Sequence, residues 1–480
     1  MLFLKTNNHT SKLPVFICLC SHRHVSICNV KYQRKIFLFI VIINVFYFFF
    51  FQKTIILLST IVSIAKSIPK ISWEQNADPM WITYNNAISN KEHFVVCSEE
   101  ESINLHGLGL EKIPKDLVKS QTIQSISLHN NNIQKIPIDA FEEVPLLKCL
   151  NLAYNYISFD KLEIKHDNLK TLIIDFQVTP ETNDVTTLSE AKINCPNVDT
   201  LSWRGITHEF RLLWIKMFPK LKNIYLSDSH YIQFVNETAI SYLPNLRSLY
   251  LERNSISKFV MDNFGNIEIL YLNDNPLEEF WINPIRQRLR ILSLSNCSIY
   301  NMPELNIRSL ESLDLSHNRI GTITTSAFQY IVLLENLNLD NNQLITIPPI
   351  DRSNNLKTLS LNYNYISNIT GIVRSSSLKT LNLRGNEIEN IDAMEFWNLK
   401  MLEYLDISHN KLKSLSPKWH KGMNRLKYLN LQYNNFINIE YMSIFHISYL
   451  KELYIKNNNI TYIDLDTLSR VPNNCTIYVL

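Results

Sequence analysis

The sequence predicts an α/β-type repeat solenoid, a horseshoe with a concave parallel β-sheet and an irregular or short-helical convex side. Two observations predict it. A short apolar pattern, L-x-x-L-x-L-x-x-N-x-I/L, recurs along most of the 480 residues, and aromatic and β-branched residues are frequent enough to form a large core. Since one such unit cannot bury its apolar face alone, neighbouring units must stack.

The repeat can be placed residue by residue. Within each unit the L-x-L alternation is typical of a short strand whose leucines point inward. Spacings between units run from 21 to 29 residues, most of them 21–25. Fifteen units begin at Ile123, Leu147, Leu169, Val198, Leu221, Leu246, Ile267, Leu289, Leu310, Leu334, Leu356, Leu378, Leu402, Leu426 and Leu450.

The ninth position of the unit favours asparagine. There the backbone turns into the interior and exposes N–H and C=O groups that need partners. An amide side chain has both donors and an acceptor, so stacked units predict a structural ladder. Its members are Asn131, Asn155, Asn254, Asn275, Asn318, Asn342, Asn364, Asn386, Asn410, Asn434 and Asn458.

The pattern resembles the extracellular leucine-rich repeats of the typical animal subtype, with the Ala-Phe element at Ala140-Phe141 and Ala327-Phe328. The resemblance covers about residues 98–480 and is closest to Toll-like receptor ectodomains and secreted insect immune proteins. It implies a binding protein that forms homo- or heterodimers. Cys97 stands where the family's N-terminal cap has four cysteines, and Cys475 is followed by no full C-terminal cap.

We therefore expect four regions: a leader (1–67), an N-terminal flank and cap strand (68–122), the fifteen repeats (123–473) and a terminal strand (474–480). The leader holds eight basic and no acidic residues, which leaves 39 basic and 44 acidic residues, a net charge of −5, for the rest. That balance excludes the basic surface that nucleic-acid binding needs.

Two interpretations of the leader are open. Ile55–Ala65 has the length of a signal-peptide core, with cleavage before Ile68 and secretion as the result. Alternatively, Ile36–Phe51 stays in the bilayer and makes a type II membrane protein with the repeats outside. Both place the repeats outside the cytosol, where N-glycosylation is expected at Asn236, Asn296, Asn368, Asn459 and Asn474.

The cysteines give no metal-type spacing. Cys297 occupies a ninth position, which predicts a buried structural thiol. The pairing among the other cysteines of the repeat region is open: Cys97, Cys149, Cys195 and Cys475.

Ligand contacts are expected on the concave face, where repeat positions 3, 5, 7 and 8 point outward. Tyrosine and arginine carry much of the energy of protein interfaces, because they join a large contact area to a polar group. Tyrosine also favours strands, so a purely structural ladder explains the same residues. The expected ligand-binding residues are Tyr225, Tyr250, Tyr271, Glu252 and Arg253, with a second group of Tyr404, Tyr428 and Tyr454.

One stretch is irregular. An insertion at 179–185 lengthens the unit before Val198, and Ile206 stands where asparagine belongs. His208, Arg211 and Trp214 follow. A functional loop and drift of the repeat explain these features equally well.

No catalytic motif, metal-ligand spacing or phosphate-binding loop is present, so we expect no enzyme, no metal and no cofactor. The first functional hypothesis is a secreted protein that recognises a protein or microbial ligand in innate defence, as sensor, co-receptor or decoy. The alternatives are a membrane-tethered adhesion or matrix protein and a fragment of a Toll-like receptor ectodomain.

Overall fold

The computed structural model describes residues 70–72, 93–97 and 101–479, except 116, 159–161, 179–191, 207–214, 216, 231, 233–242, 263–264, 284–287, 351–354, 370–375, 394, 446 and 464. It has two compact units, one formed by residues 78–383 and one by residues 384–480 together with 1–77. Within the described ranges no helix is both long and apolar enough to cross a bilayer. The two apolar runs of the leader lie outside the described residues.

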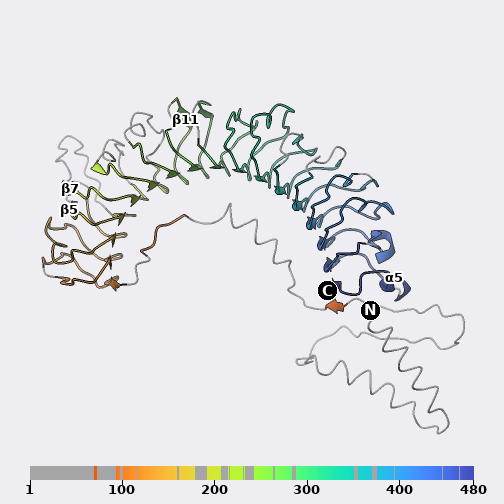
Figure 1. Ribbon diagram of the computed structural model, residues 1–480, viewed down its shortest axis with the longest axis horizontal. Coiled ribbons are helices and arrows are strands. Elements are labelled where there is room, and N and C mark those ends of the chain that lie inside the picture. Colours follow the sequence, from red (N-terminus) through yellow and green to blue (C-terminus); the bar gives the residue numbers. More distant parts are fainter. Residues whose placement is uncertain are drawn as a thin grey trace, which may run out of the picture. The chain divides into compact units, whose positions relative to one another are not determined.

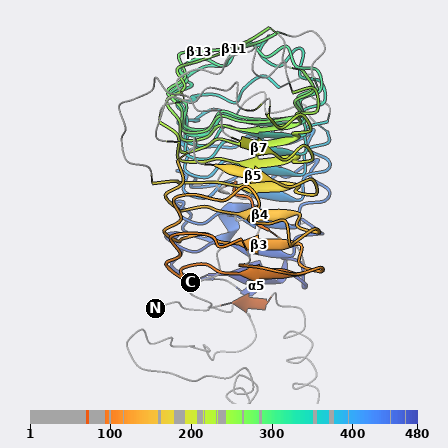
Figure 2. The ribbon, with the colours of Figure 1, turned by 90° about the vertical axis from the view of Figure 1, so that its left-hand side faces the viewer.

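The unit of residues 78–383 is a parallel β-solenoid, as predicted. In Figure 1 its strands lie along the inner side of a curve and the connecting segments lie outside; Figure 2 shows β3 and β4 stacked one above the other. Each strand pairs in parallel with the strand of the next turn. The strands in this order are β2 (Ser102–Asn104), β3 (Ser125–Ser127), β4 (Cys149–Asn151), β6 (Thr171–Ile173), β8 (Thr200–Ser202), β9 (Asn223–Tyr225), β10 (Ser248–Tyr250), β12 (Ile269–Tyr271), β14 (Ile291–Ser293), β15 (Ser312–Asp314), β16 (Asn336–Asn338), β17 (Thr358–Ser360) and β18 (Thr380–Asn382).

The unit of residues 384–480 repeats the same arrangement. Its parallel strands are β19 (Tyr404–Asp406), β20 (Tyr428–Asn430), β21 (Glu452–Tyr454) and β22 (Thr476–Tyr478), and β1 (Lys70–Ser72) pairs with β22. Among its described residues, two short helices lie in the connecting segments, the 3-10 helix η3 (Ile439–Met442) and the α-helix α5 (Leu465–Ser469).

Burial explains why each strand forms where the L-x-L pattern lies. All fifteen predicted units contain a strand at their third to fifth residues. A leucine or isoleucine lies at the centre of each of these strands and stacks on its equivalent in the next turn. Leu313, Leu337, Leu359 and Leu381 do so, and their side chains are at most 1% exposed. Each buried leucine contributes about 2 kcal/mol, so the stack favours one register.

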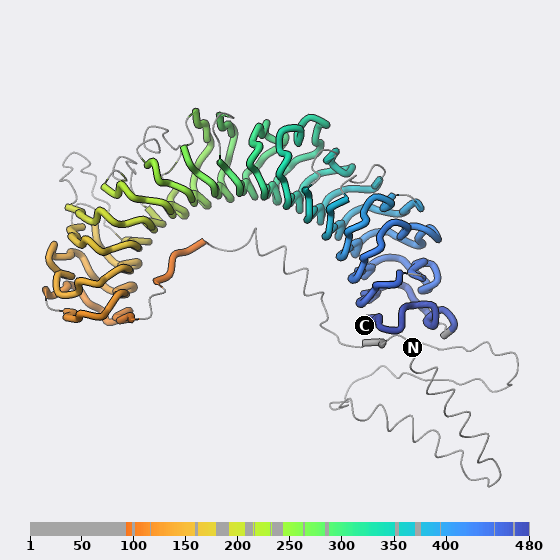
Figure 3. Tube along the Cα trace, in the orientation of Figure 1, coloured from red at the N-terminus to blue at the C-terminus, as the bar shows by residue number. Residues whose placement is uncertain are grey.

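The outer side is mostly irregular, as the successive loops of Figure 3 show. Phe141 and Phe328 of the Ala-Phe elements are buried beneath it, and so is Phe396 of a later repeat. Two short parallel pairs of outer strands were not predicted. They are β5 (Glu163–Lys165) with β7 (Lys192–Asn194), and β11 (Lys258–Met261) with β13 (Glu279–Ile282).

The ninth-position asparagines link neighbouring turns. Asn318 is representative: its Oδ1 accepts hydrogen bonds from the backbone N–H groups of Cys297 and Ile299 in the turn before. Its Nδ2 donates to the carbonyls of Leu294, in that same turn, and Leu315, in its own. One amide therefore satisfies buried backbone groups of two turns.

Other side chains take this role where asparagine is missing. The amide of Gln177 accepts from the Ile157 N–H and donates to a carbonyl of the preceding turn. Ser229 Oγ accepts from the N–H of Ile206. Cys297 Sγ lies 3.2 Å from the Leu272 carbonyl, and this fully buried thiol is free, as its position predicted.

Candidate functional site

The inner face is the sheet surface that points away from the core, formed by positions 3, 5, 7 and 8 of each turn. The eighth residue adopts a left-handed conformation in turn after turn, with φ of 63° at Asp228, 52° at Arg253 and 59° at Asp274. This turn ends the strand and lets the ninth side chain enter the core. The eighth side chain is thereby left at the margin of the inner face.

Tyr225, Tyr250 and Tyr271 form a continuous tyrosine stack on this face. They end β9, β10 and β12 and pair directly across the sheet. The first two rings lie 4.1 Å apart between centroids and 4° from parallel, and the next two lie 5.3 Å apart and 7° from parallel. Burial raises the pKa of all three hydroxyls, so the rings stay neutral at physiological pH.

Glu252 places a carboxylate beside the stack. It lies two residues after Tyr250, and its side chain is only 3% exposed. Its Oε2 accepts a hydrogen bond of 2.6 Å from Ser227 Oγ in the neighbouring turn. Its Oε1 lies 2.7 Å from Nδ1 of His93, a residue that precedes the repeats. Both oxygens of a buried carboxylate are thus engaged, as burial of charge requires.

His93 belongs to a short extended segment, residues 93–97, which we call the strap. His93, Val95 and Cys97 are half-buried, whereas Phe94 and Val96 are 58% and 63% exposed. This alternation is that of a strand with one side on a surface. The His93 ring lies 4.0 Å from the Tyr271 ring and 4.9 Å from the Tyr250 ring, between centroids.

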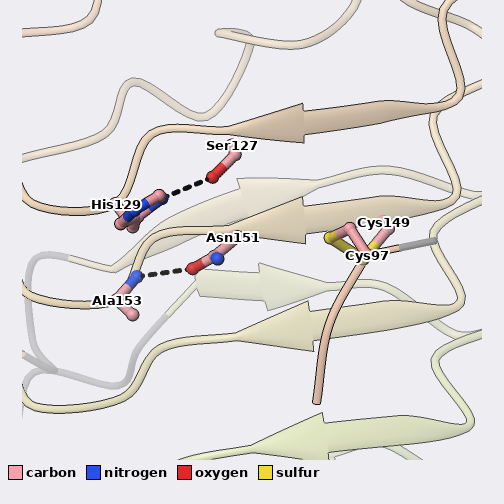
Figure 4. The surroundings of a disulfide bond; sticks show 6 residues. All are labelled: Cys97, Ser127, His129, Cys149, Asn151 and Ala153. Carbon is pink, nitrogen blue, oxygen red and sulfur yellow. Dashed lines mark hydrogen bonds between the residues drawn. A yellow bond between two sulfur atoms is a disulfide. The ribbon is translucent and has the colours of Figure 1, made fainter. Parts of the chain in front are cut away.

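A disulfide fixes the other end of the strap to the inner face. Cys97 bonds to Cys149, the third residue of its turn, as Figure 4 shows. Val95 and Cys97 pack against an apolar cluster of Cys149, Ala153 and Ile173. Cys195, Cys297 and Cys475 are free and buried.

The strap was not anticipated from the sequence, although two signals point to it. Cys149 occupies an inner-face position, where a cysteine from outside the core can reach its sulfur. The apolar or ring-bearing residues His93, Val95 and Cys97 recur with period two just before the array.

Arg253 lies at the margin of the stack but is held by ion pairs. Its Nη2 is 3.1 Å from Asp228 Oδ2, and its side chain is 35% exposed. Arg204 approaches the same Asp228 carboxylate at 3.8 Å and donates from Nε to Asp175 at 3.1 Å. These four residues form a charge-balanced row, so Arg253 offers a ligand only part of its hydrogen-bonding capacity.

The second predicted group separates into two stacked pairs. Tyr404 and Tyr428 occupy third positions, and their rings lie 4.5 Å apart. Tyr454 occupies a fifth position and stacks on Tyr478 at 4.4 Å, while its hydroxyl donates to Glu452. Tyr404 and Tyr428 are half-buried, and Tyr454 is 4% exposed. The pair formed by Tyr404 and Tyr428 is therefore the more accessible of the two.

Four of the five expected glycosylation sites lie in described parts of the chain, and all four are exposed: Asn296, Asn368, Asn459 and Asn474. Asn236 lies outside the described residues. So do the insertion at 179–185 and His208, Arg211 and Trp214.

The described residues hold no group of three or more His, Cys, Asp or Glu side chains that could bind a metal ion. Of the repeat histidines, His129, His317 and His409 contact neighbouring side chains. His129 hydrogen-bonds through Nδ1 to Ser127 Oγ and stacks on His106, and burial lowers its pKa. Tyr250 and Tyr271 are only 9% and 7% exposed, with the His93 ring against them. The inner face thus combines neutral aromatic rings, one buried carboxylate and rows of paired charges, which suits binding once these rings are uncovered.

Known sequences match the repeat region. The family model described as leucine rich repeat matches residues 219–277, 287–344, 376–436 and 402–460, and it describes a repeat rather than a catalytic domain. Human Toll-like receptor 8 is 27% identical over 206 residues, which are 42% of this chain and 16% of the receptor. Mouse lumican is 31% identical over 157 residues, 31% of this chain and 46% of lumican. The matches thus span less than half of each relative.

Solved structures share the fold. The Toll–Spatzle complex of Drosophila gives a TM-score of 0.51 at 19% identity, covering 74% of this chain and 47% of the matched chain. The mouse RP105/MD-1 complex gives a TM-score of 0.54 at 19% identity, covering 75% of this chain and 67% of the matched chain. At these identities the likeness concerns the fold alone.

Proposed function

Because the chain is a leucine-rich-repeat protein related to Toll-like receptors and lumican, we propose that it acts outside the cytosol as a binding protein. Its ligand is a protein or a microbial surface molecule, and the inner face is the contact surface. The role we propose is in innate immunity, as a soluble sensor, co-receptor or decoy. The single observation that carries the proposal is the tyrosine stack beside the buried Glu252 carboxylate.

Three further observations support this proposal. Toll and RP105, which share the fold, are found in complexes with the proteins Spatzle and MD-1. The described sequon asparagines are exposed, which suits glycosylation during secretion. Aromatic side chains concentrated on a rigid sheet lose little conformational entropy on binding, so they are effective anchors.

The compartment is tested by expressing the full chain in insect cells and determining the N-terminal residue and the location of the product. A glycosylated product in the medium that begins near Ile68 supports the secreted protein. A membrane-bound product that retains Ile36–Phe51 overturns secretion and favours the tethered adhesion or matrix protein.

The contact surface is tested with purified lipopolysaccharide, peptidoglycan and β-glucan, and with cross-linking to haemolymph proteins. Changing Tyr225, Tyr250 and Tyr271 to alanine is expected to lower affinity at least tenfold while circular dichroism shows the fold retained. The control changes exposed tyrosines away from the inner-face strands, Tyr330 and Tyr365, and leaves binding unchanged. Equal binding by the two variants contradicts the inner-face assignment.

A further inference from the structure

The strap places one of the chain's own side chains in the site that the proposed function assigns to a partner. His93 lies against Tyr271 and Tyr250 and within 2.7 Å of Glu252 Oε1. The residues that it contacts come from two neighbouring turns, more than 150 positions later in the sequence. This contact shows what kind of group the site accepts: a planar ring with an N–H donor.

The chemistry of the site favours a cation. Oε2 of Glu252 is held by Ser227 Oγ, which leaves Oε1 to face the strap. A carboxylate that is 3% exposed gains most from a charged donor, because hydrogen bonds to ionised groups are the stronger ones. The neighbouring tyrosine rings are neutral, and aromatic faces attract guanidinium, ammonium and imidazolium groups.

A second contact lies two residues along the strap. Val95 packs with Cys97 against Cys149, Ala153 and Ile173, which form a small apolar patch. Phe94, between the two contacts, points away and is 58% exposed. An extended segment therefore presents alternate side chains to the inner face: a basic or imidazole group first, and a small apolar group two positions later.

We propose that the site formed by Tyr250, Tyr271 and Glu252, with the patch beside Cys149, recognises an extended segment of a partner protein. That segment carries a basic side chain followed two residues later by a small apolar one. The strap occupies the site in the isolated chain, and a partner segment must displace it. This inference rests on the proposed function, since it names the chemistry of the ligand for the same inner face.

The disulfide sets how strongly the strap competes. Only three residues separate His93 from Cys97, so the bond to Cys149 keeps His93 near its site at a high effective concentration. A partner must overcome this intramolecular contact. Breaking the disulfide is therefore expected to raise the affinity for a partner segment, as removal of a tethered competitor does.

The test measures peptide binding by fluorescence anisotropy. The probes are synthetic peptides of residues 91–97 with serine at the Cys97 position, carrying histidine, arginine or alanine at the His93 position. The receptor is the full chain with His93→Ala and Cys97→Ser. We expect the arginine peptide to bind at least tenfold more tightly than the alanine peptide, and the natural chain to bind it at least tenfold more weakly than this receptor does.

Matched variants test whether the preference for the arginine peptide comes from the Glu252 carboxylate. Adding Glu252→Gln to the receptor is expected to reduce the preference for arginine over alanine to less than threefold. Glu278→Gln, the same change at an exposed position, is expected to keep the full preference. On the strap, Phe94→Ala in the natural chain is expected to leave peptide binding as weak as before, because that ring points away from the site.

Equal affinities for the arginine and alanine peptides overturn the proposal. So does the absence of binding at millimolar peptide, or a preference that survives Glu252→Gln. These outcomes are distinct from failure of the proposed function. If the tyrosine variants lose a partner but the peptides do not discriminate, the inner face binds by other chemistry. If the peptides discriminate but no partner depends on the tyrosines, the site serves only to hold the strap.

Discussion

Cys97 is bonded to Cys149 across a sequence separation of 52 residues, and the bond joins a segment outside the repeats to an inner-face position of a repeat strand. Closing a loop of this length restricts the unfolded chain and stabilises the folded one. We expect the double change Cys97→Ser and Cys149→Ser to lower the free energy of unfolding by about 2–4 kcal/mol. Denaturant titration of the natural chain and of the double variant measures this difference in the free energy of unfolding.

A reductant supplies the control for this prediction. The other thiols in the described part of the chain, Cys195, Cys297 and Cys475, are buried, and burial raises the pKa of Cys195 to about 11 and that of Cys297 to about 12, so they react slowly. Reduction should therefore destabilise the natural chain as much as the double change does and leave the double variant unaffected. A stable natural chain under reduction would contradict the role of the bond.

The amide of Asn318 is expected to stabilise the solenoid. Asn318→Ala removes the acceptor for two buried N–H groups and the donor to three backbone carbonyls. Each buried polar group left unpaired costs about 1–3 kcal/mol, so a loss of about 3 kcal/mol or more is expected in thermal or denaturant unfolding. The control is Asn355→Ala at an exposed position, which removes one hydrogen bond to the Val332 carbonyl. We expect this variant to lose less than about 1 kcal/mol of unfolding free energy. Equal losses would show that the ladder adds no stability.

The repeat strands could be predicted because their cause is local. An L-x-L segment identifies a strand, and the leucine or isoleucine at the centre of each of the fifteen predicted strands is buried. Position counting also separates Tyr404 and Tyr428, at third positions, from Tyr454, at a fifth position. The sequence-based grouping of these three tyrosines overlooked that difference, and the structure shows separate stacks.

The strap could not be predicted in the same way. The contact of His93 with Glu252 joins positions 159 residues apart and depends on the path that the chain takes before the repeats. The repeat periodicity of the sequence does not predict a contact between residues this far apart. The pairing of the outer strands β11 and β13 is similar: Phe259 and Phe280 stack because they are direct partners in that parallel pair, which no repeat of the L-x-L pattern announces.

Asp340 is expected to make stability depend on pH. Burial raises the pKa of this carboxyl from 3.8 to about 6, and the nearby Asp314 carboxylate adds to the effect. Between about pH 4 and 6 the folded chain then binds a proton that the unfolded chain lacks, so the free energy of unfolding falls as pH rises through this window. Asp340→Asn removes that dependence. Relative to the variant, the natural chain should lose about 2–3 kcal/mol of unfolding free energy between pH 4 and 7.

Asp139 provides the comparison for that experiment. Its exposed carboxyl has a pKa lowered by the hydrogen bond from Lys115, so it titrates below the window. Asp139→Asn should leave the slope between pH 4 and 6 unchanged. If Asp340→Asn also leaves the slope unchanged, burial of Asp340 does not control the pH dependence.

Gly422 is expected to tolerate no side chain. Its φ is +104°, and a Cβ added there would lie 2.2 Å from the carbonyl oxygen of Trp397 and 2.9 Å from its Cα. Because these atoms belong to the backbone of the preceding turn, relief requires that turn to move. We expect Gly422→Ala to lower the free energy of unfolding by about 2–4 kcal/mol, measured by denaturant titration.

Gly265 provides the control for this variant. It has a φ of +63° but nothing within 4 Å of an added Cβ, so Gly265→Ala isolates the backbone cost of about 1–2 kcal/mol. If the two glycine variants lose the same stability, the contact with Trp397 does not limit residue 422.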